Sequence, residues 1–301
     1  MWPKMKVLAL TALFTFVLFS AAACADSDAG YITIRGERYS TDLTELDLRA
    51  MNLTNEDIAP LRQMANLNEL WLGDNRISDL TPLAGLSNLE RLNLHSNQIY
   101  DLTPLAGLEN LELLSLSNNA VSNLAPLAGL TNLEQLLLDN NQISDITPLA
   151  GLTNLILLWL DGNQISDLVP LTALTNLDEL WLIGNQIRDL APLAGLVNLE
   201  ILTLDDNLIS EVTPLAGLAN LTVLWLDGNQ ISNIAALSEL TNLEELWLAG
   251  NRVSDITPLA GLSWEAFLFL DGNPISDWSP VAHIEHVDGR PLQYSPLIGR
   301  E

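Results

Sequence analysis

The sequence predicts an α/β solenoid, a fold of stacked coils in which each coil holds one short strand and one tight turn. The pattern Leu-x-x-Leu-x-Leu-x-x-Asn ends in asparagine ten times at a constant interval of 22 residues. These asparagines are Asn75, Asn97, Asn119, Asn141, Asn163, Asn185, Asn207, Asn229, Asn251 and Asn273. One coil of this length cannot bury enough apolar surface to offset the entropy of ordering it, so each coil must pack on its neighbours.

Each unit divides into a strand half and a turn half. In residues 67–88, segment 70–72 alternates between inward leucine and outward tryptophan, which is the periodicity of a strand. Apolar residues in segment 80–86 recur every third position, which favours a tight 3₁₀ or short helical turn. Asp79 and its equivalents in the other units are placed to cap this turn.

The repeated asparagines are expected to have structural roles. The asparagine that ends the pattern is expected to bond to backbone groups where the chain turns inward. A second series begins Asn66, Asn88, Asn110 and Asn132, and we expect it to do the same at the junction between units.

The segment LEQLLLDNNQISDITPLAGL at residues 133–152 carries a family resemblance. It resembles the leucine-rich repeat family, in particular the 22-residue bacterial class seen in internalins. The resemblance implies a curved right-handed superhelix with a parallel β-sheet on the concave face and short 3₁₀ or helical turns on the convex face. It implies little about the partner, because this fold serves many functions.

The chain is expected to divide into a leader, two caps and a central array. Residues 1–23 are expected to be a signal peptide, 24–30 a short linker after a lipidated cysteine, and 31–66 an N-terminal cap with a first imperfect repeat, in which segment 31–35 is an extra strand. Residues 67–281 contain the ten 22-residue repeats, the last one truncated, and 282–301 form a C-terminal cap or tail. Capping prevents the exposed ends of a solenoid from aggregating.

The leader indicates export. Lys4 and Lys6 precede an apolar stretch, and Ala22-Ala23-Cys24 resembles the lipobox of bacterial lipoproteins, in which the cysteine is acylated. Cys24 is the only cysteine of the chain and has no disulfide partner within it, which favours this chemical use. We therefore expect a lipid anchor on the outer face of a bacterial membrane; the alternative is simple secretion with a free thiol.

The charge limits the partners. The formal net charge is −26, which disfavours nucleic acid and anionic lipid headgroups and favours cationic or neutral partners. The only expected contact with a membrane is through the lipid anchor.

The outward positions of the predicted strands carry the candidate binding residues. The central position is aromatic at Trp71, Trp159, Trp181, Trp225, Trp247 and Phe269. Beside it runs an acidic row formed by Asp139, Asp161, Asp205, Asp227 and Asp271. The other flank includes Glu179, Glu245 and Phe267. Since adjacent strands are about 4.8 Å apart, Trp159 is expected to stack on Trp181, and Trp225, Trp247 and Phe269 are expected to form another stack.

These residues predict a surface that binds an extracellular or envelope protein or peptide of basic and apolar character. Alternatively, the tryptophans only stiffen the sheet, or they are copies left by repeat duplication. The protein would then be a structural or envelope-display protein without a specific ligand.

A third alternative is a glycan- or calcium-dependent adhesin, in which Asp205 and Asp206 would contribute oxygen ligands. A metal on a helix containing His283, His286 and Asp288 is also conceivable, but the pattern favours no metal and no cofactor. No phosphate loop or nucleophile motif is found, so we expect a non-enzymatic protein and a monomer.

Overall fold

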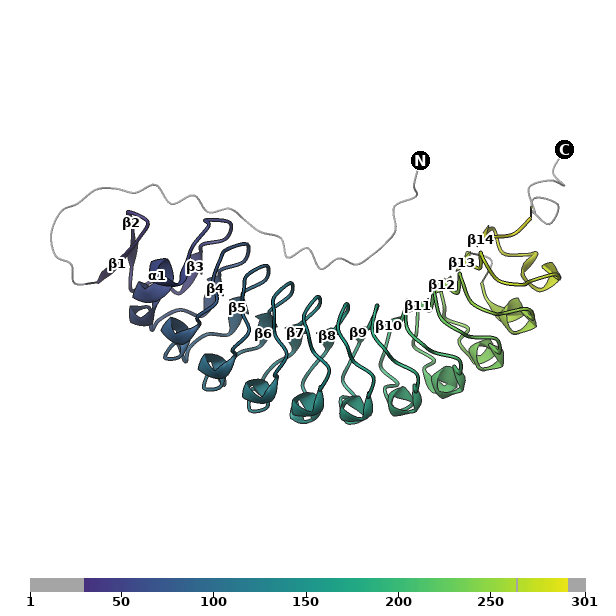
Figure 1. Cartoon of the computed structure of the whole chain (residues 1–301). Coiled ribbons are helices and arrows are strands. Elements are labelled where there is room, and N and C mark those ends of the chain that lie inside the picture. Colours follow the sequence, from purple (N-terminus) through teal and green to yellow (C-terminus); the bar gives the residue numbers. More distant parts are fainter. Residues whose placement is uncertain (1–29, 264, 292–301) are drawn as a thin grey trace.

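The computed structural model describes residues 30–263 and 265–291, which form a curved solenoid (Figure 1). The predicted signal peptide, Cys24, Trp264 and residues 292–301 lie outside the described residues. The predicted fold class is confirmed: strands line the inner side of the arc, and short turns line its outer side.

In the described part of the chain, one parallel sheet of twelve strands runs the length of the arc in sequence order. Its strands are β3 (Glu45–Asp47), β4 (Glu69–Trp71), β5 (Arg91–Asn93), β6 (Leu113–Ser115), β7 (Gln135–Leu137), β8 (Leu157–Trp159), β9 (Glu179–Trp181), β10 (Ile201–Thr203), β11 (Val223–Trp225), β12 (Glu245–Trp247), β13 (Phe267–Phe269) and β14 (His286–Asp288). From β4 to β13 each residue pairs with the residue one repeat away, so equivalent side chains form straight rows.

The convex side consists of one helical turn per coil. The 3₁₀ turns are η1 (Ala59–Gln63), η2 (Thr81–Leu83), η3 (Thr103–Leu105), η4 (Ala125–Leu127), η5 (Thr147–Gly151), η6 (Val169–Leu171), η7 (Ala191–Leu193), η8 (Thr213–Gly217), η9 (Ala235–Glu239), η10 (Thr257–Gly261) and η11 (Ser279–Val281). The first coil also has a short α-helix, α1 (Asn55–Ile58). As predicted, an aspartate precedes most of these turns and accepts a backbone N–H; the Asp79 carboxylate, for example, accepts the Thr81 N–H at 2.9 Å.

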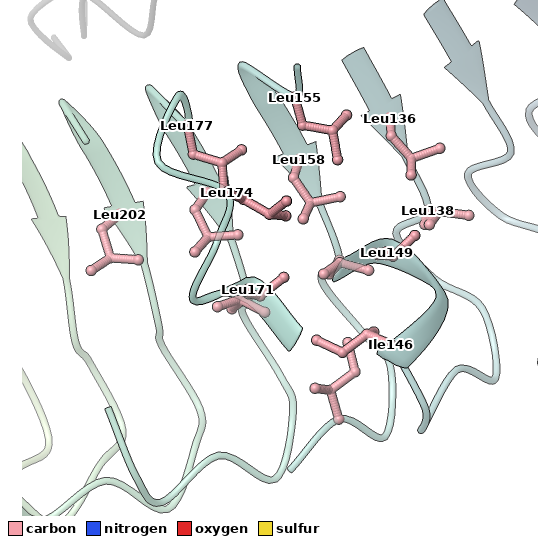
Figure 2. Close-up of a cluster of buried hydrophobic side chains, with 14 of the residues drawn as sticks. Leu136, Leu138, Ile146, Leu149, Leu155, Leu158, Leu171, Leu174, Leu177 and Leu202 are labelled. Carbon is pink, nitrogen blue, oxygen red and sulfur yellow. The ribbon is translucent and has the colours of Figure 1, made fainter. Parts of the chain in front are cut away.

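The core is a continuous column of leucines and isoleucines between the sheet and the turns. Leu158 of β8 is fully buried, and it lies between Leu136 and Leu180 of the adjacent strands. Figure 2 shows how leucines of successive coils, such as Leu149 and Leu171, fill the space behind the strands. Since each inner coil shares its core with the coils on both sides, the array has one continuous hydrophobic core.

The repeat asparagines bond to the backbone, as the sequence predicts. Nδ2 of Asn163 donates to the carbonyl oxygens of Leu138, Leu160 and Asp161, and its Oδ1 accepts the N–H of Ile143. One side chain thus satisfies backbone groups of two coils in a buried place. The second asparagine series acts in the same way: Nδ2 of Asn88 donates to the carbonyl of Ala65.

The N-terminal end has a form that the sequence pattern does not predict. Residues 31–34 do form a strand, β1 (Tyr31–Ile34), but this strand pairs antiparallel with β2 (Glu37–Ser40) in a separate sheet. The hairpin therefore covers the first coil by packing Ile32 and Ile34 on the core, without extending the main sheet.

The C-terminal end gains a strand where the sequence predicts only a covering tail. β14 pairs in parallel with β13 and contributes Val287 next to Leu268. The Leu-x-Leu pattern is absent from His286–Asp288, so periodicity could not reveal this strand.

Trp278 stands near this end at a position that is aliphatic in the preceding repeats, and it is 4% exposed. No helix within residues 30–263 and 265–291 is long and apolar enough to cross a membrane.

Candidate partner-binding surface

The concave face is formed by the first and third residues of each strand. The middle residue, such as Leu180 of β9, points into the core, while Glu179 and Trp181 beside it are half-buried and face outward. This alternation places the predicted aromatic positions in one row, as expected for a pleated strand.

Five aromatic rings form a continuous line, here called the aromatic ridge: Trp159, Trp181, Trp225, Trp247 and Phe269. The ring centroids are separated by 5.3 Å, 5.8 Å, 4.4 Å and 4.8 Å in that order. Trp225 stacks on Trp247 with an interplanar angle of 19°, as predicted. Trp159 contacts Trp181 and Trp247 contacts Phe269, but these pairs are tilted by 47° and 50°, so the stacks predicted there are not formed. The contact between Trp181 and Trp225 was not predicted, because strand β10 lies between them.

The residue of β10 in this row is Thr203, and sequence reasoning missed its importance. Thr203 is 0% exposed although it faces outward, because the indoles of Trp181 and Trp225 meet above it. A small residue within a row of tryptophans is the sequence signal that could have shown this closure.

Trp71, the other predicted member, lies apart from the ridge. Three strands separate β4 from β8, and their residues in this row are Asn93, Ser115 and Leu137. The guanidinium of Arg49 lies 5.4 Å from the Trp71 ring centroid, and it also pairs with Asp47. Trp71 therefore belongs to a separate, ion-paired part of the face.

The indole N–H groups of the ridge fall into two kinds. Nε1 of Trp247 donates to Glu245 at 2.7 Å, and Nε1 of Trp181 lies 3.4 Å from its acceptor on Glu179. The Nε1 atoms of Trp159 and Trp225 are buried without a hydrogen-bond partner among the described residues. An unpaired buried donor costs about 1–3 kcal/mol, so these two positions favour a ligand with an acceptor.

The acidic row links successive coils. Oδ1 of Asp161, Asp205 and Asp227 accepts the backbone N–H of the next coil at 2.6 Å, 2.7 Å and 2.6 Å. Asp139 accepts the hydroxyl of Ser117, whereas Asp271 at the end of the row is exposed. Most of these carboxylates therefore have a structural bond in addition to their outward position.

Burial makes the middle of this row reluctant to ionise. Burial raises the pKa of Asp161 and of Asp205 to about 7 and the pKa of Asp227 to about 6. The bonds from backbone N–H groups act in the opposite direction, but burial is the larger effect. Burial also raises the pKa of Glu179, on the other flank of the ridge. A cation placed here would favour the charged form of all four.

Phe267 ends the other flank and is 36% exposed. Its ring stacks on the imidazole of His286 at 4.5 Å with an interplanar angle of 4°. His286 therefore lies in a strand and not on the helix that a metal site with His283 would need. The His283 ring nitrogen lies 3.0 Å from the carbonyl oxygen of Leu262.

No group of three or more His, Cys, Asp or Glu side chains within residues 30–263 and 265–291 is arranged to hold a metal ion. Asp205 uses its Oδ1 atom for the Asp227 N–H. One carboxylate oxygen of the pair formed by Asp205 and Asp206 is thus already used within the protein.

The repeats match the family model for leucine-rich repeats in two copies over residues 65–107, 109–151, 153–195, 175–217 and 219–261. No curated protein matches the sequence.

Among solved structures, an internalin, InlF, from Listeria monocytogenes is 30% identical with a TM-score of 0.71, covering 84% of this chain and 89% of that one. Internalin C2 from Listeria monocytogenes is 40% identical with a TM-score of 0.60, covering 64% of this chain and 85% of that one.

The chain therefore belongs to the leucine-rich repeat family, and its repeats are of the bacterial internalin-like class. The ectodomain of a plant receptor kinase from Arabidopsis thaliana, in complex with Casparian strip integrity factor 2, shares the fold at 22% identity and a TM-score of 0.64, covering 82% of this chain and 35% of that one. This fold is typical of protein-binding domains, because the solenoid offers a long concave surface.

Proposed function

We propose that this protein binds a protein or peptide through the aromatic ridge and the acidic row, without catalysis. The observation that carries the proposal is the ridge itself, five half-buried rings in unbroken contact on the concave sheet. Tryptophan is enriched among residues that dominate binding energies, and a contiguous apolar surface of this kind is rarely left unused.

The charge of the surface defines the character of the partner. No outward strand position from β8 to β13 carries a basic residue, while Glu179, Glu245 and the acidic row flank the rings. A partner with both basic and apolar side chains would neutralise these carboxylates and cover the ridge. A nucleic acid would be repelled by the net charge of −26.

Capture of envelope and host proteins by the full chain tests this function. The double variant Trp181→Ala/Trp225→Ala should lose the captured protein, because it removes the centre of the ridge. Tyr100→Ala is the matched control, since Tyr100 is 66% exposed and lies outside the sheet. Equal capture by both variants, each folded by circular dichroism, would rule out the ridge.

We also propose that the protein is exported and lipid-anchored through Cys24 as a monomer. The support is the leader sequence, with the resemblance of Ala22-Ala23-Cys24 to a lipobox. Metabolic labelling with a fatty acid should mark the full chain and leave Cys24→Ala unmarked; equal labelling of both would contradict lipidation.

A further inference from the structure

The aromatic ridge contains one position without a ring, at Thr203 of β10. We call this position the Thr203 notch: its floor is Thr203, and its two walls are the indoles of Trp181 and Trp225. Two strand spacings separate the walls, or about 10 Å between their backbones. In the free protein the indoles lean across this gap until their centroids are 5.8 Å apart with an interplanar angle of 72°.

The closed notch leaves polar atoms without partners. Oγ1 of Thr203 is fully buried and has no hydrogen-bond partner among the described residues, and the same is true of Nε1 of Trp225. Desolvating a hydroxyl or an indole N–H without a bond is unfavourable. The notch is therefore the place in the ridge where a ligand can supply bonds that the free protein lacks.

A carboxylate lies next to the notch, two residues further along the chain. Asp205 follows Thr203 by two residues, which places both side chains on one face about 7 Å apart along the chain. Asp205 is 8% exposed, and among the described residues its carboxylate accepts one hydrogen bond, from the Asp227 N–H to Oδ1. Every ion pair among the described residues involves Arg35, Arg49, Arg91 or His95, all in the first coils, so none of the described cations pairs with Asp205.

These features together define the chemistry of the missing group. The two indoles meet edge to face in the free protein, so a ligand enters the notch only when they part, and their faces then attract a cation through the ring quadrupole. The hydroxyl and the carboxylate accept hydrogen bonds, so the group must carry several donors. A planar guanidinium fits the rings, the hydroxyl and the carboxylate, because it stacks on aromatic faces and presents five N–H donors. It has no acceptor for Nε1 of Trp225, so that N–H needs an acceptor from another group of the partner. An aliphatic side chain would leave the Thr203 hydroxyl buried and unpaired.

We propose that the Thr203 notch binds an arginine side chain of the partner, its guanidinium inserted between Trp181 and Trp225 and hydrogen-bonded to Thr203 and Asp205. This inference rests on the proposed function, because it names the chemistry that the ridge recognises. Burial raises the pKa of Asp205 to about 7, and a guanidinium in the notch would restore its charged form.

Indole ¹⁵N–¹H spectra of the full chain test the notch directly, with the Trp181 and Trp225 signals assigned from single Trp→Phe variants. The probes are Nα-acetyl-arginine amide, the uncharged isostere Nα-acetyl-citrulline amide, and Nα-acetyl-lysine amide. Arginine should shift the Trp181 and Trp225 signals saturably, with an affinity about tenfold above citrulline, which corresponds to about 1.4 kcal/mol. Equal response to citrulline, or tighter binding of lysine, would overturn the assignment.

Substitutions distinguish the notch from the rest of the ridge. Thr203→Leu fills the notch and should abolish the arginine shifts. Ser115→Leu is its matched control, because Ser115 has the same place in its strand and is 3% exposed, but Asn93 and Leu137 flank it in place of indoles. Unchanged shifts in Thr203→Leu would overturn the proposal.

Asp205→Asn keeps an oxygen that can accept the Asp227 N–H, removes the charge and replaces the second acceptor oxygen with an NH₂ group, so it tests the notch even if Thr203→Leu fails to fold. It should weaken the binding of arginine about fivefold or more and leave citrulline unchanged. Equal binding of arginine to this variant and to the natural chain would overturn the role of Asp205. If capture of the partner is lost in Trp181→Ala/Trp225→Ala while arginine and citrulline bind alike, the notch proposal fails and the proposed function stands.

Discussion

The concave face has two halves that share one backbone but present different side chains. On β3–β7, charged residues are paired: Arg49 with Asp47 at 2.6 Å and Arg91 with Glu69 at 3.7 Å. On β8–β13, the rings of the aromatic ridge touch one another, and the carboxylates beside them have no cationic partner among the described residues.

The loops that follow the strands differ in the same way. The residue with positive φ is Asp74, Ser96, Asn118 or Asn140 in the first half, and it is glycine in most coils of the second half. The glycines bare the backbone next to the acidic row, whereas polar side chains cover it in the first half. Since the leucine core is the same throughout, the fold requires neither choice, and the second half differs in ways that suit a ligand.

The largest expected effect tests whether the repeated asparagines stabilise both halves equally. Asn141→Ala and Asn207→Ala each remove a buried side chain that bonds to four backbone groups. We expect each to destabilise the protein by about 3–5 kcal/mol, since several buried backbone groups lose partners. Chemical denaturation should show similar losses; a much smaller loss in one half would show that the halves are held together differently.

The next effect concerns pH. Because the folded pKa of Asp205 is above its unfolded value, its contribution to stability is present below about pH 4 and is lost as the pH rises to about 7. Asp205→Asn should therefore stabilise the protein at pH 8 by about 2–4 kcal/mol and leave it unchanged at pH 4. Thermal denaturation at both pH values measures this difference.

Asp145→Asn is the control, because the pKa of Asp145 is shifted in the opposite direction. Hydrogen bonds from Thr147 lower the pKa of Asp145, so its contribution is present above about pH 4 and is lost at lower pH. This variant should be destabilised at pH 8 only. A stabilisation of Asp145→Asn at pH 8, or none for Asp205→Asn, would contradict the role of burial in the second half.

The third effect compares tryptophans of the two halves in binding. Trp225→Ala should weaken binding of the captured partner about 30-fold, which corresponds to a central binding residue that contributes about 2 kcal/mol. Trp71→Ala should change the affinity less than threefold, because Trp71 packs with Arg49 outside the ridge. Surface plasmon resonance measures both; comparable losses would mean that the partner covers the whole face.

The smallest effect concerns the ion pairs of the first half. Arg91→Gln breaks the exposed pair with Glu69 and should cost no more than about 0.5 kcal/mol. The measurement is the denaturation midpoint at low and high salt. A loss of more than about 1 kcal/mol would show that ion pairing, and not the shared core, holds the first coils.

The sequence predicts the repeat, the sheet, the turns and the outward rows, because a strict 22-residue period places each leucine and asparagine at the same position in every coil. It does not predict the closure over Thr203, because the lean of two indoles depends on how the curved sheet brings them together. From the sequence alone, the acidic row is expected to be free for a partner. In the structure, Asp161, Asp205 and Asp227 accept hydrogen bonds from the next coil. Such bonds join residues that are 22 positions apart, so no local sequence pattern indicates them.

Oxidative footprinting of the tryptophans, with and without the captured partner, tests the central claim most directly. Trp71 lies on the same face, and Trp278 is 4% exposed in the core, so both serve as internal references. We predict that the partner protects Trp159, Trp181, Trp225 and Trp247 and leaves Trp71 unchanged. Protection of Trp71 alone, or of none of the ridge tryptophans, would contradict the assignment of binding to the aromatic ridge.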